Sequence, residues 1–221
     1  MTVALAPLIF RVDGFVGAKL RAQLRERAAA RFAKDGHAAD ALHAAAALGW
    51  GHDGGGADPV LEALSARVAV LTRLPASHQE PAFATRSAPS AAGANANHTK
   101  PAFDHWDVTK RQRGDQDVDL LTEGGTTNRA ATVVVHLNEP PKGGQLGFPG
   151  GQKNTGAVGR GPGCNHPLVL PATEGSAYLL YNRLPDSRGD ESSQRAECPV
   201  LEGQKWTVTK WVWNKALALS E

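Results

Sequence analysis

Residues 198–213 read Cys-Pro-Val-Leu-Glu-Gly-Gln-Lys-Trp-Thr-Val-Thr-Lys-Trp-Val-Trp. From Trp206 to Trp213 the residues are mostly aromatic or β-branched and alternate in character, which predicts a β-strand. Residues 132–137 and 177–181 form two further apolar or β-branched runs, and glycine and proline turns separate all three. Short strands punctuated in this way predict a sandwich or barrel, with N-terminal helices packed outside it as support.

The first third of the chain has a helical pattern. Apolar residues recur at multiples of four through residues 16–32, with basic residues between them, so we predict a helix over 17–34. A second helix is predicted from Asp58, a suitable N-cap followed by Pro59, to a stop at Pro75. We also expect a third helical piece over 38–47 and a flexible surface loop over 87–97.

Composition limits the class of protein. A chain of 221 residues, 41% hydrophobic and 21% charged, can bury one good core, which predicts one compact domain. The net charge is only +2 and the basic residues are scattered, which argues against nucleic-acid binding. The chain has no apolar run long enough to span a membrane, and Met1 to Phe10 lacks the features of a secretory leader.

His105-Trp106-Asp107 is the first candidate for chemistry. In a strand, residues two apart point to the same side, so His105 and Asp107 would present an imidazole and a carboxylate together. These are two of the three ligands of the 2-His-1-carboxylate triad that holds Fe(II). A surface ion pair or an ordinary hydrogen-bonded histidine is the structural alternative.

Four stretches together resemble the prolyl 4-hydroxylase branch of the Fe(II)/2-oxoglutarate dioxygenases in order and spacing. The stretches are Arg129-Ala-Ala-Thr-Val-Val-Val-His-Leu-Asn138, Lys142-Gly-Gly-Gln-Leu-Gly-Phe-Pro149, Leu170-Pro-Ala-Thr-Glu-Gly-Ser-Ala-Tyr-Leu-Leu-Tyr-Asn182 and Cys198-Pro-Val-Leu-Glu-Gly-Gln-Lys-Trp-Thr-Val-Thr-Lys-Trp211. The last is the most specific, since it is close to the family's Cys-Pro-Val-x-x-Gly-x-Lys-Trp-x-x-x-Lys-Trp. The resemblance covers nearly the whole chain.

The resemblance implies a mainly β fold with N-terminal helices: a double-stranded β-helix, that is, a cupin-like jelly roll. Residues 98–221 would form the dioxygenase core, 1–86 its N-terminal helical support and 87–97 a flexible loop. His105 and Asp107 would bind iron, and Lys205 would pair with the distal carboxylate of 2-oxoglutarate. The implied activity is hydroxylation of peptidyl proline, or of a related residue, of the procollagen-proline 4-dioxygenase type. It decarboxylates 2-oxoglutarate to succinate, with ascorbate as a further cofactor and a proline-containing peptide or protein as substrate.

The chain departs from the family where that chemistry would occur. The family motif Asp-x-x-Ser-x-His-x-Gly-Cys-Pro-Val aligns without a gap on Asp190 to Val200, and Arg195 falls on the second iron-binding histidine. A protonated guanidinium has no lone pair for a metal, and its charge opposes cation binding. Ala102 also replaces an aromatic residue expected before the first ligand, and the 87–97 loop is longer than in the family. His136, His166 and Glu197 are the candidates to supply the missing ligand.

The two cysteines, Cys164 and Cys198, are too few for a disulfide framework. Secretory members of the family have cysteines at both places, so the resemblance implies a Cys164–Cys198 disulfide and an origin in the endoplasmic reticulum or secretory pathway. The alternative is that the two cysteines are buried thiols, in which case we expect a cytoplasmic protein. The sequence leaves the compartment and the oligomeric state open.

Three functions are consistent with these residues. The first is the prolyl 4-hydroxylase-like dioxygenase. The second is a catalytically dead jelly-roll paralogue, a pseudoenzyme that binds a peptide or partner because Arg195 has replaced the iron ligand. The third is a metal-independent small-molecule or glycan-binding module. We place the dioxygenase first because nearly every framework motif of that family is present.

Overall fold

The computed structural model describes residues 1–38, 41–49, 58–89, 101–104, 127–152 and 164–217. Over these residues the chain is mainly antiparallel β-structure with two α-helices. The helices are α1 (Ala18–Lys34) and α2 (Pro59–Thr72), with short 3-10 helices η2 (Ala76–His78) and η4 (Glu191–Ser193). The strands are β1 (Thr2–Leu5), β2 (Leu8–Val12), β3 (His43–Leu48), β4 (Ala82–Ser87), β5 (Arg129–His136), β6 (Lys142–Gly143), β7 (Leu146–Phe148), β8 (Leu168–Leu170), β9 (Ala177–Tyr181), β10 (Ala196–Glu197), β11 (Val200–Glu202) and β12 (Lys205–Trp213).

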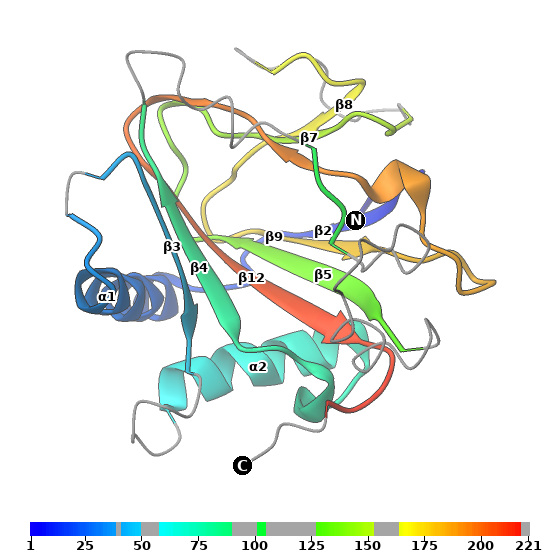
Figure 1. The fold of residues 1–221 in the computed structure, drawn as a ribbon, viewed down its shortest axis with the longest axis horizontal. Helices are drawn as coiled ribbons and strands as arrows, with labels where there is room; N and C mark the ends of the chain where they lie inside the picture. The colour runs from blue at the N-terminus through cyan, green and yellow to red at the C-terminus, as the bar shows by residue number, and fades with distance from the viewer. Residues whose placement is uncertain (39–40, 50–57, 90–100, 105–126, 153–163, 218–221) are drawn as a thin grey trace, which may run out of the picture.

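A seven-stranded sheet, the major sheet, runs in the order β1-β2-β9-β5-β12-β4-β3. Its longest strand, β12, pairs antiparallel with β5 on one side and β4 on the other (Figure 1). Thr207 lies opposite both His136 and Thr85, and this register fixes which side chains share a face. The predicted strands over 132–137, 177–181 and 206–213 are confirmed as β5, β9 and β12.

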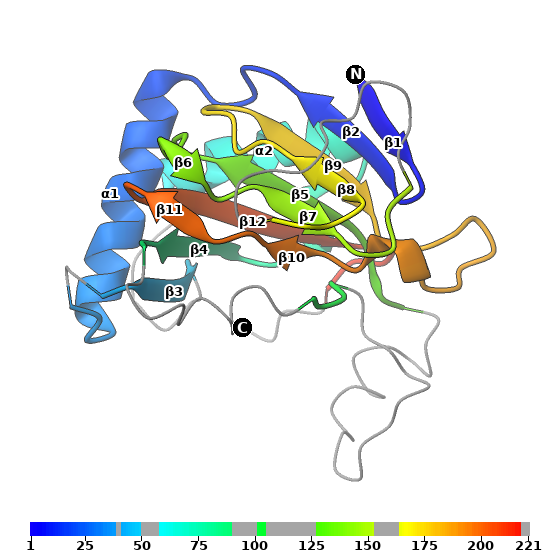
Figure 2. The same ribbon diagram turned by 90° about the horizontal axis from the view of Figure 1, so that it is seen from above.

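A smaller layer of strands faces one side of the major sheet. It consists of a three-stranded sheet, β10-β7-β8, and the two-stranded pair β11-β6 (Figure 2). Leu146, Phe148, Leu168 and Leu170 of β7 and β8 pack against Ile9, Val134, Tyr178 and Leu180 of the major sheet. We call the side of the major sheet that faces this smaller layer the inner side. The two facing layers give the chain a sandwich architecture.

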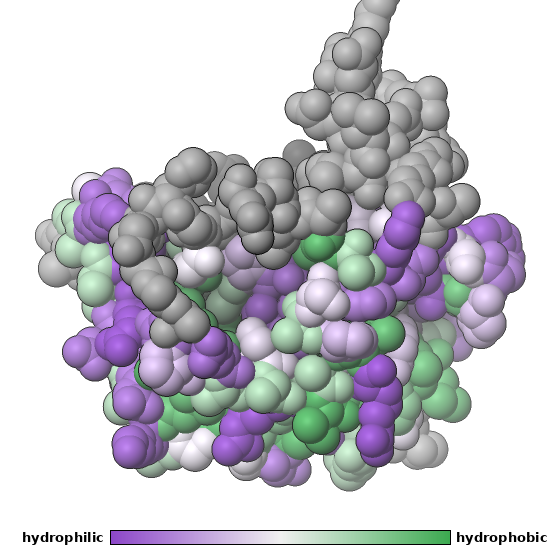
Figure 3. Space-filling view, turned by 90° about the horizontal axis from the view of Figure 1, so that it is seen from below, coloured by the Kyte–Doolittle hydropathy of each residue, from purple (hydrophilic) through white to green (hydrophobic). Residues whose placement is uncertain are grey.

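The helices cover the other side of the major sheet, the helix side (Figure 1). Leu24, Ala28 and Phe32 are the buried residues of α1, spaced by four, as an amphipathic helix requires. In α2 the Asp58 carboxylate accepts a hydrogen bond from the Val60 amide at 2.9 Å, and Arg73 ends the helix in the left-handed conformation. Both predicted helices are therefore confirmed. Their outer surface mixes polar and apolar residues (Figure 3).

The third predicted helix, over 38–47, is wrong. Residues 43–48 form β3, which pairs with β4 from His43↔Ser87 to Leu48↔Ala82. Alanine favours helices locally, but β4 offers this segment backbone hydrogen-bond partners along one side. Ala44, Ala46 and Leu48 are also buried in the same cluster as Phe32 of α1. Tertiary packing therefore overrides the local preference.

The N-terminal region contributes more than helical support, because β1, β2, β3 and β4 are all strands of the major sheet. The predicted 87–97 loop begins at the end of β4, and its residues 90–97 lie outside the described part of the chain. Among the described residues, neither helix has the length and apolar composition needed to cross a membrane.

Candidate active site

Polar side chains line the inner side of the major sheet at one end of β12. Strand alternation sends Lys205, Thr207 and Thr209 to this side, whereas Trp206 and Val208 belong to the apolar cluster on the helix side. The Thr207 and Thr85 hydroxyl oxygens lie 2.6 Å apart, so the two side chains share a hydrogen bond across β12 and β4. A polar region inside an otherwise apolar sandwich is where a ligand site is expected.

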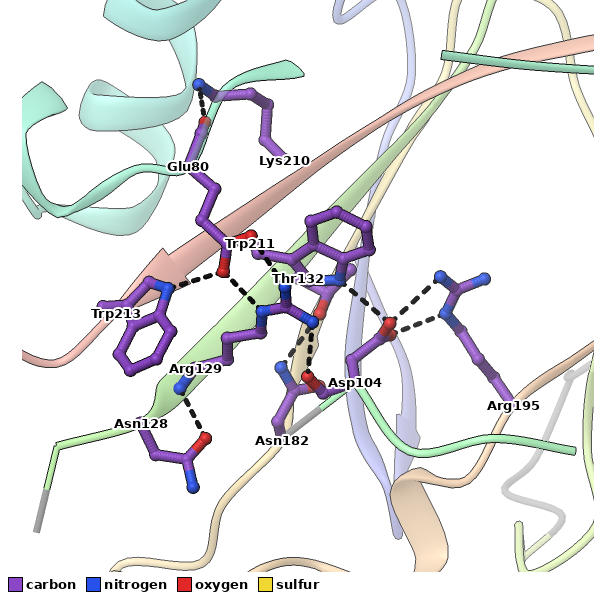
Figure 4. Close-up of polar contacts among 10 residues, drawn as sticks. All are labelled: Glu80, Asp104, Asn128, Arg129, Thr132, Asn182, Arg195, Lys210, Trp211 and Trp213. Atoms are coloured by element: carbon purple, nitrogen blue, oxygen red, sulfur yellow. Dashed lines mark hydrogen bonds and ion pairs between the residues drawn. The ribbon is translucent and has the colours of Figure 1, made fainter. Parts of the chain in front are cut away.

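Residues 101–104 reach this region by pairing with the segment that carries Arg195. The Ala102 amide donates to the Arg195 carbonyl at 2.9 Å, and the Arg195 amide donates to the Ala102 carbonyl at 3.0 Å. This pairing sets Asp104 against the guanidinium of Arg195 (Figure 4). Arg195 Nε donates to Asp104 Oδ2 at 2.6 Å and Nη2 donates to Oδ1 at 3.1 Å, which is the bidentate geometry of a strong ion pair.

Arg195 also reaches a second carboxylate. Its Nη1 donates to Glu197 Oε1 at 2.9 Å, and Glu197 Oε2 in turn accepts from Lys205 Nζ. Asp104, Arg195, Glu197 and Lys205 therefore form a chain of alternating charges, which we call the charge chain. Three of its members were predicted site residues, and the structure brings them together. Asp104 was missed, because its partner lies 91 residues away in the sequence.

The charge chain holds its carboxylates ionised. Burial opposes ionisation of Asp104, but the charge and hydrogen bonds of Arg195 outweigh it and lower the pKa of that carboxyl. Burial likewise opposes ionisation of Glu197, and the charges of Lys205 and Arg195 lower its pKa. Against the effect of burial, the same carboxylates raise the pKa of Arg195. Arg195 therefore stays a fixed cation at any working pH.

A second polar network supports Asp104 nearer the other end of β12. The Trp211 indole donates to Asp104 Oδ1 at 2.9 Å, and Arg129 Nη1 donates to the Asp104 carbonyl at 3.2 Å (Figure 4). Arg129 lies over the Trp211 ring, 4.1 Å from its centroid, and forms a double ion pair with Glu80. Arg129 and Trp211 both lie in stretches that resemble the family, so the sequence pointed to them. The residues around them gave no indication that they would contact Glu80 and Asp104.

His136 ends β5 beside this region and is fully buried. Neither ring nitrogen has a hydrogen-bond partner within the described residues, and the ring packs edge-on against Tyr178. Burial, together with the charges of Lys205, Arg11 and Arg195, lowers the pKa of His136 well below its ordinary value. The imidazole is therefore neutral and has a lone pair available to a ligand.

His166 lies elsewhere, on the outer face of the smaller layer. A Cβ atom at Gly147 would lie 2.1 Å from its Cδ2, so the imidazole covers the Gly147 backbone. Gly147 pairs with Ala196, whereas Glu197 pairs with Leu146 and shares the inner side with it. Strand alternation therefore separates His166 from the charge chain.

The structure contains the Cys164–Cys198 disulfide that the resemblance implied. The Cα atoms are 5.3 Å apart, which suits a disulfide, and both cysteines pack with Val169 of β8. The bond joins the residue before Pro199 to the segment that leads into β8. His105 and Asp107, the predicted iron ligands, lie outside the described residues.

Comparison with known proteins shows which proteins the chain resembles in sequence. No family model matches the chain. Prolyl 4-hydroxylase 1 of Arabidopsis thaliana is 28% identical over 163 residues, a match that covers 72% of this chain and 49% of that protein. The chain thus spans about half the length of this curated relative.

Two solved structures share the fold. A viral collagen prolyl hydroxylase from Paramecium bursaria Chlorella virus-1, solved as a 2-oxoglutarate complex, superimposes with a TM-score of 0.61 at 15% identity, over 93% of this chain and 94% of that one. A prolyl hydroxylase solved with a hypoxia inducible factor peptide, from Trichoplax adhaerens, gives a TM-score of 0.54 at 13% identity, over 96% and 87%. The predicted jelly roll is confirmed. By sequence the chain is related to the prolyl 4-hydroxylases, so the predicted resemblance to the prolyl 4-hydroxylase-like 2-oxoglutarate oxygenases is confirmed.

Proposed function

We propose that the chain is a 2-oxoglutarate-dependent dioxygenase of the prolyl 4-hydroxylase type. It would hydroxylate peptidyl proline, or a related residue, and decarboxylate 2-oxoglutarate to succinate. The observation that carries this function is Lys205, a buried ammonium on the inner side of the jelly roll at the start of β12. The viral relative in fold, which was solved with 2-oxoglutarate, and the relative solved with a peptide support the co-substrate and the substrate class.

Lys205 has the chemistry to bind the distal carboxylate of 2-oxoglutarate. A compact ammonium in a largely desolvated place attracts a carboxylate more strongly than one in water does. Thr207 and Thr85 supply hydroxyl groups on the same side, and His136 supplies a neutral imidazole. These groups could orient a small, highly oxygenated ligand without adding net charge.

Iron, which the family implies, does not fit the described residues. Arg195 stands at the motif position of the second histidine, has no lone pair to offer, and already forms ion pairs with the carboxylates of Asp104 and Glu197. Within the part of the chain that the structure describes, no three His, Cys, Asp or Glu side chains are grouped as a metal site. We assign His105 and Asp107 as metal ligands from the sequence alone and derive no reaction step through the metal.

The three rescue ligands differ in what they could offer. Glu197 is already bonded to Arg195 and Lys205, and His166 lies on the outer face of the smaller layer. His136 is neutral and has no hydrogen-bond partner among the described residues. It is therefore the first residue to mutate if the wild type binds iron.

The decisive experiment is an anaerobic titration with Fe(II) and 2-oxoglutarate, following the charge-transfer absorption of the chelated iron. Wild type is compared with Arg195→His and with Arg188→His, a control at an exposed arginine. Succinate release is then measured in air with a proline-rich peptide and ascorbate. We expect absorption and succinate from the wild type, with a ligand other than residue 195 completing the iron site, and no change in the control. Absence of both signals from the wild type, with their appearance in Arg195→His, would contradict this function.

That contrary outcome would favour the pseudoenzyme that binds a peptide or partner. The ion pairs of Arg195 are the observation for which such a loss of metal would account. Peptide binding by the wild type that is indifferent to chelators would be its positive test.

We further propose an oxidising compartment, the endoplasmic reticulum or secretory pathway. The Cys164–Cys198 disulfide supports it, because disulfides persist mainly in such compartments. Thiol titration of protein isolated from its native cells under alkylating conditions tests this, since two free thiols would contradict it.

A further inference from the structure

The carboxylate of Glu197 already occupies Lys205. Its Oε2 accepts from Lys205 Nζ, and its Oε1 accepts from Arg195 Nη1 at 2.9 Å. One carboxylate thus bridges two cations with both of its oxygens, as a bound carboxylate ligand would. Lys205 is also the residue to which we assign the distal carboxylate of 2-oxoglutarate, so the side chain and the co-substrate would compete for one ammonium.

Glu197 and Arg195 are paired departures from the family motif. In the ungapped alignment of Asp190 to Val200, Arg195 falls on the histidine and Glu197 falls on the glycine two residues later. A glycine has no side chain with which to reach Lys205. The two replacements carry opposite charges and bond to each other, and Glu197 also bonds to Lys205.

Exposure identifies Glu197 as the member that can move. The side chains of Lys205 and Arg195 are 5% and 14% exposed, whereas that of Glu197 is 34% exposed. The two cations are therefore held inside the protein, while the carboxylate that they share is partly exposed. Rotation of Glu197 toward water would uncover both cations without disturbing the Arg195–Asp104 pair.

Charge balance gives the consequence. Two cations face two carboxylates in the charge chain, so a small dicarboxylate that entered with Glu197 in place would add uncompensated negative charge to a buried region. If the Glu197 carboxylate were removed, the Lys205 ammonium would lose the ion pair that it forms with Glu197. It would then attract a carboxylate from solution to the same position.

We infer that Glu197 is an internal carboxylate that occupies a carboxylate-binding position formed by Lys205 and Arg195, and that small carboxylates bind there only when Glu197 is displaced. The naming of 2-oxoglutarate as the natural occupant rests on the proposed function. The competition itself concerns any small carboxylate, and metal is not required for it.

The test is calorimetric titration of metal-free protein with 2-oxoglutarate, and separately with succinate. Wild type is compared with Glu197→Ala, with Glu197→Gln, which keeps the side-chain shape without the charge, and with Glu202→Gln, a control at the exposed glutamate that pairs with Lys142. We expect Glu197→Ala to bind both compounds about tenfold or more tightly than wild type. Without the Glu197 carboxylate, the Lys205 ammonium can pair with a carboxylate of the added compound. Glu197→Gln should fall between the two, and Glu202→Gln should match wild type.

A thermal measurement covers the case in which Glu197→Ala is poorly folded. Succinate should raise the melting temperature of both Glu197 variants more than that of wild type or Glu202→Gln, since ligands stabilise the state that binds them. Equal affinity and equal thermal response in all four proteins would overturn the inference.

Failure of the inference and failure of the proposed function give different results. If the Glu197 variants bind 2-oxoglutarate more tightly but no protein releases succinate with Fe(II), the internal carboxylate stands and the dioxygenase activity fails. If the wild type binds 2-oxoglutarate as tightly as the variants and releases succinate, the activity stands and the internal carboxylate fails.

Discussion

The two sides of the major sheet use the same strands for opposite purposes. On the helix side, Val133 and Val135 of β5 pack in one apolar cluster with Leu64 of α2. The alternate residues of the same strand point to the inner side. Among them, Thr132 accepts a hydrogen bond from Asn182, and His136 lies close enough to Lys205 and Arg195 to feel their charges. The helix side stabilises the fold mainly by burying apolar surface. The inner side has an apolar cluster of its own under β7 and β8, but beside it the sheet also buries the charge chain, and buried charge stabilises a fold only if every partner is present.

This contrast explains where the chain tolerates unfavourable groups. The charge chain, the Arg129–Glu80 pair and His136, whose ring nitrogens have no hydrogen-bond partner among the described residues, all lie toward the inner side, where a ligand would bind. Buried charge and unsatisfied polar groups are typical of functional sites, where consistency with the fold gives way to chemistry. Buried cations also lie on the helix side among the described residues: Lys210 donates to the Glu80 carbonyl, and Arg86 donates to the Ala38 carbonyl and lies over the rings of Phe32 and Trp206.

The largest expected effect is that of Arg195→Ala on the inner side. It leaves the buried Asp104 carboxylate and Glu197 without their shared cation, so the free energy of unfolding should fall by about 3–5 kcal/mol. Urea denaturation measures this. Arg188→Ala, which breaks the exposed pair with Asp186, should cause no measurable change. An Arg195→Ala protein as stable as wild type would show that the charge chain does not stabilise the fold.

Leu64→Ala probes the helix side. Leu64 is fully buried among the apolar residues of the sheet, so its truncation should lower the free energy of unfolding by about 3 kcal/mol through lost burial and a cavity. Unlike Arg195→Ala, its destabilisation should not change with salt concentration, because no charge is involved. Val70→Ala, at an exposed position of the same helix, serves as the control. A salt-dependent loss in Leu64→Ala would remove the distinction between the two sides.

Lys210 gives the helix side a pH dependence. Burial lowers the pKa of Lys210 to about 8, with the charge of Glu80 opposing that shift. The unfolded chain releases the same proton at about pH 10.4, so between these values the unfolded state binds more protons and stability rises with pH. We expect the free energy of unfolding to increase by about 2 kcal/mol from pH 8 to pH 10.

The matched variants for this rise are Lys210→Met, which should abolish it, and Lys142→Met at an exposed lysine, which should retain it. Chemical denaturation at several pH values provides the measurement. A rise that persists in Lys210→Met would assign it to another group.

The smallest expected effect is that of Thr207→Val on the inner side. It removes one partner of the Thr85–Thr207 hydrogen bond and should lower the free energy of unfolding by about 1 kcal/mol. In the double variant Thr85→Val/Thr207→Val, part of that loss should be recovered, because no hydroxyl is left unpaired. Additive losses in this double-mutant cycle would mean that the two hydroxyls are not coupled.

Much of the fold could be predicted because its signals are local. The residues of α1 and α2 carry their own periodicity and caps, and β5, β9 and β12 carry their own β-branched and aromatic runs. The β3 segment failed for the same reason: its alanines favour a helix unless a sheet edge is present to pair with them. The prediction of N-terminal support missed four strands of the major sheet, which are short or weakly patterned.

The candidate site divides in the same way. Lys205 and Arg195 could be found from motif spacing, because each stands at a fixed distance from Cys198-Pro199. Asp104 could not, because only the pairing of residue 102 with residue 195 brings its carboxylate to the guanidinium.

By itself, the sequence determined the helices, the central strands, the family resemblance and the replacement of a histidine by Arg195, since each depends on residues a few positions apart. Only the tertiary structure decided that Arg195 joins Asp104 to Glu197 and that Glu197 occupies Lys205. The physical reason is that the free energy of a buried charge depends on the partners that the fold brings within hydrogen-bonding distance, and those partners come from distant segments of the chain.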